Sequence, residues 1–283
     1  MEAVEVELEV RPPFDGDGLL AWLRPRAIEG VEAVGDRTYA RVLALPHGPA
    51  VMELTLHADR VAARYELTDP GDVDLAVRLS RRLLDLDADP EAIDAALSAD
   101  PLLAHLVDKV PGIRLPGQVD GFEVAVRAIV GQQVSVAGAR TILGRIARSR
   151  GIEVDLPLAR AHGLTHAFAT AESLAEAVPE EFAMPRGRAG AILSVAHAVA
   201  TGDLDLGPDA DRAAARHGLL AIRGIGPWTA DYFTMRALGH PDVLLDTDLV
   251  LRRVLAREGL DRTRTDRWRP WRSYASLHLW RIA

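Results

Sequence analysis

Residues 219–257, LLAIRGIGPWTADYFTMRALGHPDVLLDTDLVLRRVLAR, contain the strongest local pattern in this chain. Residues 211–221 just before it have the alternation of Ala, Arg and Leu that is typical of a short amphipathic helix. Residues 227–238 predict a second helix, because Pro stands at the first position and Gly239 just past the end. Only Ile-Arg-Gly-Ile-Gly, residues 222–226, separates the two. The stretch therefore predicts two helices joined by a tight hairpin.

The two glycines of this hairpin, Gly224 and Gly226, let the backbone turn sharply and leave its N–H groups open to another molecule. They stand at the positive end of the second helix, which favours an anion such as a phosphate. A dinucleotide-binding fingerprint is disfavoured, because that motif follows a strand and here a helix precedes it. A plain tight turn also explains the two glycines alone. The two glycines alone do not distinguish a phosphate site from a plain tight turn, so other parts of the sequence are needed to decide.

Two aspartates, Asp246 and Asp248, open the next predicted helix after the apolar residues 243–245. A carboxylate at a helix start is stabilised in its charged form by the N-terminal end of the helix. Asp is also a favoured N-cap residue. We expect Asp246 to be the cap and Asp248 to be available for chemistry.

These motifs resemble a known superfamily. GIGPWTADYF (residues 224–233) followed by VLLDTDLVLRRVLAR (243–257) is similar to the helix-hairpin-helix and aspartate signature of the DNA glycosylases, with Asp248 at the aspartate position because Arg253-Val254 follow it at the family's spacing. Three further segments resemble one branch, the bacterial 3-methyladenine DNA glycosylase II family: RPPFD (11–15), LPGQVDGFEVAVRAIVGQQVSVAGA (115–139) and RPWRSYASLHLW (269–280). The resemblance covers nearly the whole chain.

The resemblance implies a DNA glycosylase of base excision repair that flips alkylated purines, of the 3-methyladenine and 7-methylguanine type, out of double-stranded DNA. It would excise them hydrolytically and leave an abasic site. Asp248 would stabilise the positive charge that develops on the sugar. Two alternatives stay open: a glycosylase for another damaged purine, or a non-catalytic, structure-specific DNA-binding protein with the same hairpin.

The resemblance also assigns aromatic residues to the base pocket. Trp228, Tyr232 and Trp280 match pocket positions of the family, and electron-rich rings attract a cationic base by roughly 0.5 to 2 kcal/mol each. Each ring is equally compatible with a place in the core. The remaining tryptophans are assigned to packing: Trp22, Trp268 and Trp271.

Contacts with DNA are expected at the hairpin and at one turn. Gly224, Gly226 and the Thr229 side chain would hold a backbone phosphate, and Gln133 stands where the family has an apolar wedge that fills the gap left by a flipped base. No cofactor is expected to be required. By resemblance, a structural Na⁺ or K⁺ would bind the carbonyl groups of Leu220, Ile222 and Ile225.

Strand cleavage is not expected. Relatives that cut DNA carry a lysine between the hairpin and the following Thr-Ala, and here that position is Trp228. The chain contains a single lysine, Lys109, in a distant segment. A Schiff base needs a primary amine, so the sequence predicts a monofunctional enzyme without lyase activity.

The length and composition of the chain exclude some classes of protein and of site. The chain has 283 residues, is 48% hydrophobic and has no cysteine, which excludes disulfides and a four-cysteine iron–sulfur cluster. No apolar run approaches the length of a membrane span and no leader is evident, so we expect a cytoplasmic protein that acts as a monomer away from membranes. The net charge is −8, yet residues 211–283 carry 13 Arg against 8 acidic residues, so the segment with the hairpin is basic.

The expected fold class is α+β. Residues 1–95 predict a small antiparallel α+β domain, with a period-2 strand at 2–10, further strands at 39–45, 51–56 and 61–67, and helices at 18–23 and 72–86. From residue 119 onward the pattern is helical. The resemblance implies two helical lobes with a cleft between them: residues 121–240, ending in the hairpin, and residues 96–120 plus 241–283, carrying Asp248.

Overall fold

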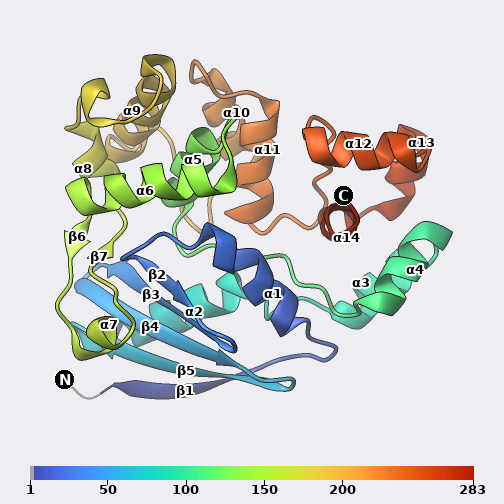
Figure 1. Ribbon diagram of the computed structural model, residues 1–283, viewed down its shortest axis with the longest axis horizontal. Coiled ribbons are helices and arrows are strands. Elements are labelled where there is room, and N and C mark those ends of the chain that lie inside the picture. Colours follow the sequence, from blue (N-terminus) through green and yellow to red (C-terminus); the bar gives the residue numbers. More distant parts are fainter. Residues whose placement is uncertain (1–2) are drawn as a thin grey trace.

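A five-stranded antiparallel sheet forms the N-terminal domain of the computed structural model, which describes residues 3–283 apart from the side chain of Arg262 (Figure 1). Its strand order is β1-β5-β4-β3-β2. The strands are β1 (Val4–Glu9), β2 (Glu32–Val34), β3 (Thr38–Leu45), β4 (Gly48–Leu56) and β5 (Arg60–Leu67). The four predicted strands are confirmed, with residue 2 outside the described residues. Strand β2 was not predicted, because three residues are too few to show an alternation.

The two faces of the sheet pack against different partners. In β3, Tyr39 and Leu43 lie in a core with α1 (Gly16–Leu23) and α2 (Val73–Leu83), the two helices that the sequence predicts here. Ala40 and Val42 point to the other face and pack with α7 (Pro157–Ala161) and with β7 (His166–Ala167). Strand β7 pairs with β6 (Ile152–Glu153) in a second small sheet that was not predicted.

The first helical lobe contains the hairpin. Its helices are α5 (Gly121–Val130), α6 (Val136–Arg150), α8 (Ala171–Ala175), α9 (Arg186–Ala200), α10 (Arg212–Ala221) and α11 (Pro227–Arg236). They share one apolar core, to which the N-terminal domain contributes Ile28 and Val31. The two helices predicted on either side of the hairpin, at 211–221 and 227–238, are confirmed as α10 and α11.

The second helical lobe joins two distant parts of the chain. Its helices are α3 (Pro90–Leu97), α4 (Pro101–Lys109), α12 (Leu249–Arg257), α13 (Arg262–Thr265) and α14 (Arg272–Trp280). Ile93 and Leu97 of α3 share a core with Leu251, Trp268 and other residues of the C-terminal segment. The expected domain boundary at residue 95 thus falls inside α3, because this helix packs entirely with the second lobe. Short 3-10 helices complete the chain: η1 (Arg24–Arg26), η2 (Pro70–Asp72), η3 (Pro179–Glu181) and η4 (Asp266–Trp268).

A buried ion-pair network fastens the sheet to the first lobe. Arg41 on β3 contacts Glu123 on α5 at 2.7 Å, and Arg127 on α5 contacts Glu32 on β2 at 2.5 Å. Burial would raise the pKa of Glu32, but the guanidinium groups of Arg127 and Arg41 outweigh it and lower the pKa to about 2. The carboxylate is therefore charged at neutral pH. No role was predicted for these residues, which meet only in the folded chain.

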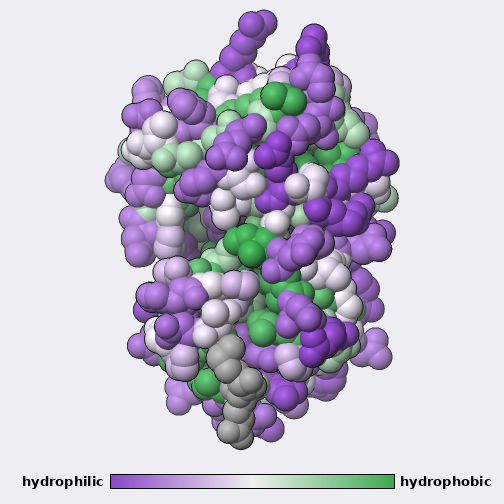
Figure 2. Space-filling model, turned by 90° about the vertical axis from the view of Figure 1, so that its left-hand side faces the viewer, coloured by the Kyte–Doolittle hydropathy of each residue, from purple (hydrophilic) through white to green (hydrophobic). Residues whose placement is uncertain are grey.

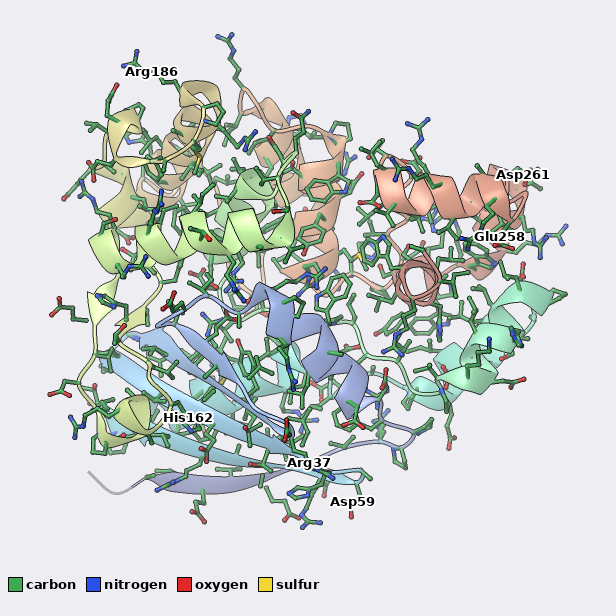
Figure 3. The ribbon with its side chains drawn as sticks, in the orientation of Figure 1. Arg37, Asp59, His162, Arg186, Glu258 and Asp261 are labelled. Carbon is green, nitrogen blue, oxygen red and sulfur yellow. The ribbon has the colours of Figure 1, made fainter. Side chains whose placement is uncertain are left out.

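The outer surface is largely polar. Figure 2 shows a hydrophilic face with small, separate hydrophobic patches. Charged side chains such as Arg186, Asp261 and Asp59 lie at the periphery (Figure 3). Among the described residues, none of the helices is both long enough and apolar enough to cross a membrane.

Candidate active site

The hairpin between α10 and α11 presents two exposed glycines. Gly224 has φ +95°, a conformation that favours glycine. An added Cβ at Gly226 would meet nothing within 4 Å, so the space beside this residue is open. Within residues 3–283, neither glycine amide donates a backbone hydrogen bond, and Gly226 is the N-cap of α11. The free amides at a helix N-terminus form an arrangement suited to an anion.

Thr229 does not present its side chain to this open space. It is buried, and its Oγ1 accepts a 2.9 Å hydrogen bond from Nε2 of Gln132, which also donates to the carbonyl of Gly224 at 3.1 Å. The expected contact between the Thr229 side chain and a phosphate is therefore not supported. Gln132 thereby connects the turn after α5 to the hairpin. No local pattern distinguishes Gln132 from its neighbour Gln133, so this contact was not predicted.

Gln133, at the expected wedge position, is exposed and has φ +56°. Its neighbour Val134 is 37% exposed and lines the cleft described below. Residues 133–137 of this turn are all exposed. The wedge role of Gln133 stays a prediction, and Val134 supplies the apolar group that glutamine lacks.

The carbonyl groups expected to hold a cation belong to the same hairpin. The carbonyl of Ile222 accepts a hydrogen bond from the amide of Ile225 at 3.1 Å. The cation site at the carbonyl groups of Leu220, Ile222 and Ile225 stays a prediction. In the part of the chain that the structure describes, no group of three or more His, Asp or Glu residues has the arrangement of a metal site.

Asp248 is the N-cap of α12, contrary to the assignment of the cap to Asp246. Its Oδ1 accepts hydrogen bonds from the amides of Val250 at 3.0 Å and Leu251 at 2.9 Å. The helix begins at Leu249, so only Asp248 can reach the free amides of its first turn. Capping does not remove Asp248 from the site, because a carboxylate has a second oxygen.

The second oxygen, Oδ2, faces Trp228, and the capping oxygen, Oδ1, also faces Trp280. Nε1 of Trp228 donates to Oδ2 of Asp248 at 2.9 Å, and Nε1 of Trp280 donates to Oδ1 at 3.3 Å. Trp228 comes from α11, Asp248 from the start of α12 and Trp280 from the end of α14. The carboxylate is thus held from both lobes.

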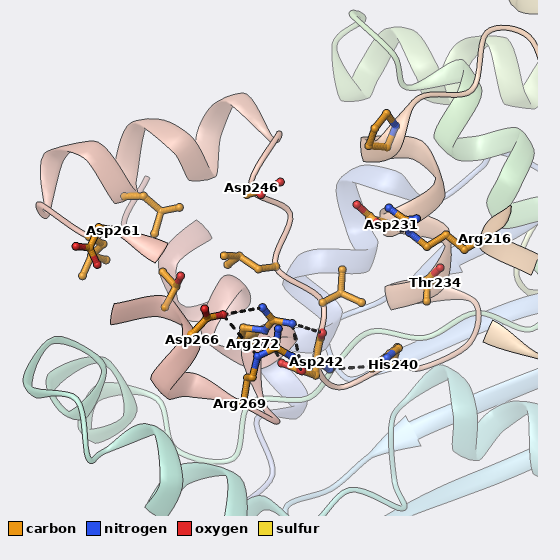
Figure 4. A pocket seen from close by; sticks show the side chains of 16 residues that line it. Arg216, Asp231, Thr234, His240, Asp242, Asp246, Asp261, Asp266, Arg269 and Arg272 are labelled. Atoms are coloured by element: carbon orange, nitrogen blue, oxygen red, sulfur yellow. Dashed lines mark hydrogen bonds and ion pairs between the residues drawn. The ribbon is translucent and has the colours of Figure 1, made fainter. Parts of the chain in front are cut away.

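Asp246 lies elsewhere. Its side chain is exposed and lines a separate cavity of about 550 Å³ with Asp242, Arg269 and Arg272 (Figure 4). Arg272 pairs with Asp242 at 2.5 Å and with Asp266 at 3.3 Å. Those arginine charges are already matched by carboxylates, so this second cavity has the features of a structural ion-pair cluster.

The cleft at Asp248 is a cavity of about 460 Å³. Trp228, Tyr232 and Trp280 all line it, as the sequence predicts, and Trp22 from α1 lines it too. Trp228 stacks on Tyr232 with ring centres 5.1 Å apart, and Trp22 stacks on Trp280 at 5.4 Å. Assigning Trp22 to packing alone was wrong: the N-terminal domain supplies one wall of the cleft. Trp268 is buried in the second lobe, as expected.

Arginines also line this cavity. Arg26, on η1, lies with its guanidinium carbon 3.7 Å from the ring centre of Trp22, and Arg236 lies 5.5 Å from the ring centres of Trp22 and Tyr232. Burial lowers the pKa of Arg26 from its ordinary value. Neither arginine was predicted to lie at the site, because nothing in the local sequence distinguishes them from surface residues.

Comparisons with known proteins identify the family of this chain. Residues 5–120 match the family model of the AlkA N-terminal domain. The chain is 35% identical over 286 residues to DNA-3-methyladenine glycosylase 2 of Escherichia coli strain K12, covering 96% of this chain and 95% of that protein. The chain belongs to the 3-methyladenine DNA glycosylase II family.

This AlkA-family chain is also similar to a longer relative and to a solved structure. It is 44% identical to a Mycobacterium tuberculosis protein described as a probable bifunctional transcriptional activator/DNA repair enzyme AlkA, over 98% of this chain and 56% of that protein. The chain thus spans about half the length of that relative. The solved 3-methyladenine DNA-glycosylase from Archaeoglobus fulgidus has the same fold, with a TM-score of 0.83 and 20% identity over 97% of each chain.

In this AlkA-family chain, Lys109 is the last residue of α4 and does not line the cavity. Trp228 occupies the position after Pro227, and its indole bonds to Asp248. The cleft therefore offers a carboxylate, aromatic faces and guanidinium groups but no primary amine among its described lining residues.

Proposed function

We propose that this chain is a monofunctional DNA glycosylase that flips alkylated purines, of the 3-methyladenine and 7-methylguanine type, out of duplex DNA and hydrolyses the N-glycosidic bond, leaving an abasic site. The observation that carries the proposal is the position of Asp248. Its carboxylate faces a cavity lined by Trp228, Tyr232 and Trp280. A volume of about 460 Å³ is in the usual range for a small-molecule site.

The carboxylate suits the chemistry of glycosidic bond cleavage. As the bond breaks, positive charge develops on the sugar, and a fixed negative group beside it lowers the barrier. Hydrogen bonds from Trp228, Trp280 and two backbone amides fix the orientation of Asp248 before substrate binds. The group therefore needs little reorganisation during the reaction. The free Oδ2 lone pair can also orient the attacking water.

The hairpin supports duplex DNA as the partner. The amides of Gly224 and Gly226 would bind a backbone phosphate close to the lesion, and the turn at Gln133 and Val134 would enter the gap left by the flipped base. A Na⁺ or K⁺ on the carbonyls of Leu220, Ile222 and Ile225 would bridge the hairpin to that phosphate. The proposal includes action as a monomer in the cytoplasm, without a required cofactor.

Relatives support the same substrate class. The names of the E. coli and Archaeoglobus fulgidus proteins specify 3-methyladenine, and the name of the Mycobacterium tuberculosis protein specifies DNA repair. The similarity to the E. coli protein covers 96% of this chain.

Incubation with methylated duplex DNA tests the proposal. Mass spectrometry of the released small molecules should detect 3-methyladenine and 7-methylguanine, and the DNA should retain intact strands until alkali is added. Undamaged DNA provides the control. Binding to methylated DNA without released bases would show a non-catalytic DNA-binding protein instead.

A further inference from the structure

Exposed hydrophobic side chains lie together at the mouth of the cavity beside Asp248. Six large hydrophobic residues of the described chain are exposed, and four of them belong to this region. Val134, Val136 and Val250 line the cavity. Leu249 stands in the chain between Asp248 and Val250, both of which line it. Contiguous exposed apolar groups mark sites of interaction. Leu249 and Val250, the two that the second lobe supplies, have no role in the proposed function.

Leu249 is not part of any apolar core. It is 67% exposed, the highest value among these residues. Leu251 and Val254 of the same helix are buried in the core of the second lobe, and Leu249 lies about 200° around the helix axis from Leu251. Among the described residues, neither Leu249 nor Val250 belongs to one of the apolar cores. Packing of the fold therefore does not account for two apolar side chains at this position.

Two arginines lie on the same face of α12 as Leu249. Arg252 and Arg253 follow it by three and four residues, which places them on one side of the helix. Both are exposed, and among the described residues neither guanidinium pairs with a carboxylate or donates a hydrogen bond. Arg257, at the end of the helix, differs because it pairs with Glu258 at 2.8 Å. Uncompensated positive charge therefore lies in the first turns of α12, beside the apolar groups.

The exposed residues Leu249, Val250, Arg252 and Arg253 are here named the α12 face. We propose that the α12 face is a second docking surface for duplex DNA, provided by the second lobe. The inference rests on the proposed function, which makes duplex DNA the partner. The two guanidinium groups would contact phosphates. Leu249 would pack against the base or sugar surface that becomes exposed beside a flipped nucleotide.

The position of the α12 face suits this role. The hydrogen bond from Trp228 to Asp248 joins the first turn of α11 to the start of α12, so the α12 face begins beside the glycine hairpin (Figure 1). Leu249 directly follows Asp248, with Cα atoms about 3.8 Å apart. A sugar held against the carboxylate would therefore bring neighbouring nucleotides within reach of Leu249. The hairpin would hold DNA from the first lobe and the α12 face from the second, which positions the sugar between them.

A protein partner or a second copy of the chain fits the α12 face less well. Two apolar side chains bury far less than the roughly 800 Å² per partner of a stable protein interface. A symmetric dimer through this face would also place Arg252 and Arg253 against the same residues of the second copy. Unpaired arginines on a chain with a net charge of −8 favour a polyanion instead.

Cysteine labelling tests where DNA docks, because the chain has no cysteine of its own. Leu249→Cys places a single thiol on the α12 face, and Val178→Cys is the matched control. Val178 is 50% exposed and lies near the end of α6, where Glu181 pairs with Arg150, whereas the cavity is lined by the beginning of that helix. Mass spectrometry measures the rate of maleimide addition with and without a saturating duplex that contains an abasic-site analogue. DNA should slow the labelling of Leu249→Cys by about tenfold or more and leave that of Val178→Cys unchanged.

Affinity measurements separate the apolar contact from the charges. Leu249→Ser should weaken binding to the abasic duplex about five- to tenfold without altering its salt dependence, because no phosphate contact is lost. The double variant Arg252→Gln/Arg253→Gln should weaken binding and reduce the slope of log affinity against log salt concentration by about 1 to 2. Val178→Ser and Arg78→Gln, which replaces an exposed arginine on α2, are the controls and should match the wild type.

The outcomes distinguish this inference from the proposed function. Equal labelling of Leu249→Cys with and without DNA, alongside release of methylated bases by the wild type, would overturn the α12 face alone. Wild-type affinity in both α12-face variants would do the same. Labelling that slows as the protein concentration rises, without DNA, would identify a second copy as the occupant instead. Shielding by DNA without release of methylated bases would support the α12 face and overturn the proposed excision activity.

Discussion

The indole nitrogen of Trp228 donates a 2.9 Å hydrogen bond to Oδ2 of Asp248, and this bond joins the two helical lobes across the cleft. Trp228 follows the first residue of α11, directly after the glycine hairpin, and Asp248 caps α12. The element proposed to hold the DNA backbone and the carboxylate proposed to act on the sugar are therefore connected through one side chain.

Asp248→Asn should lower the excision rate by about 10²- to 10³-fold, because the charge that stabilises the sugar cation is lost. Asn is also a good N-cap, so the melting temperature should change little. DNA affinity should stay equal or improve, because a repulsion with phosphate is removed. Single-turnover kinetics with 7-methylguanine DNA measure the rate.

Asp246→Asn is the matched control and should keep wild-type rate and stability, because Asp246 is exposed and is not the N-cap of α12. Loss of activity in this control alone would identify the wrong aspartate.

Trp228→Phe should slow excision by about five- to tenfold, because the aromatic surface stays but the donor to Asp248 is lost. A hydrogen bond to a charged group contributes about 1.5 to 3 kcal/mol, part of which positions the carboxylate. Trp271→Phe is the control, since Trp271 packs against Tyr274 outside the cleft. Equal rates for both variants would show that the bond does not orient Asp248.

Borohydride should not trap this chain on abasic DNA. The lysine position of the strand-cutting relatives is Trp228, and Lys109 lies at the end of α4 away from the cavity. A Schiff base needs a primary amine. Denaturing electrophoresis with a bifunctional glycosylase as positive control checks this result. A covalent adduct that persists in Lys109→Ala would contradict the monofunctional assignment.

Gly226→Val should weaken binding to abasic DNA and leave the fold intact, because the added side chain enters open space where the phosphate is expected. Gly190→Val provides the comparison, since a Cβ there also meets nothing within 4 Å and the residue lies on α9 outside the hairpin. Fluorescence anisotropy at several salt concentrations measures both affinities. Equal affinity of the two variants would rule out the hairpin as the phosphate site.

The contributions of Asp85 and Asp120 to stability should fall as pH rises from about 4 to about 6. Burial raises the pKa of Asp85 and of Asp120 to about 6, so the folded chain binds protons that the unfolded chain has released across this window. Asp85→Asn removes one of these groups while keeping an acceptor for the amide of Leu115 and the hydroxyl of Tyr274. The variant should be more stable relative to wild type at pH 7 than at pH 4.5, by about 2 kcal/mol.

Urea denaturation at both pH values measures this difference. Asparagine tolerates the backbone of Asp85, whose φ is +53°. The exposed Asp59, substituted by asparagine, should show no such pH dependence. An identical effect of Asp85→Asn at both pH values would mean that Asp85 is ionised with an ordinary pKa in the folded chain.

Local sequence patterns were sufficient for most of the elements. Alternation of apolar and charged residues identified β1, and short apolar runs bounded by turn residues identified β3, β4 and β5, of which β3 is buried on both faces. Pro227 and the two glycines located the start of α11. Elements of two or three residues, such as β2, β6 and β7, escaped prediction, because their pairing depends on distant strands and their patterns are too short.

The sequence by itself predicted the fold class, the hairpin, and a pocket lined by Trp228, Tyr232 and Trp280. Only the tertiary structure decided between Asp246 and Asp248 as the N-cap, since two acids two residues apart have the same local preference and the first helical turn selects one. It also placed Trp22 and Arg26 in the cleft, because long-range packing of the N-terminal domain against both lobes determines which of their faces line a shared cavity.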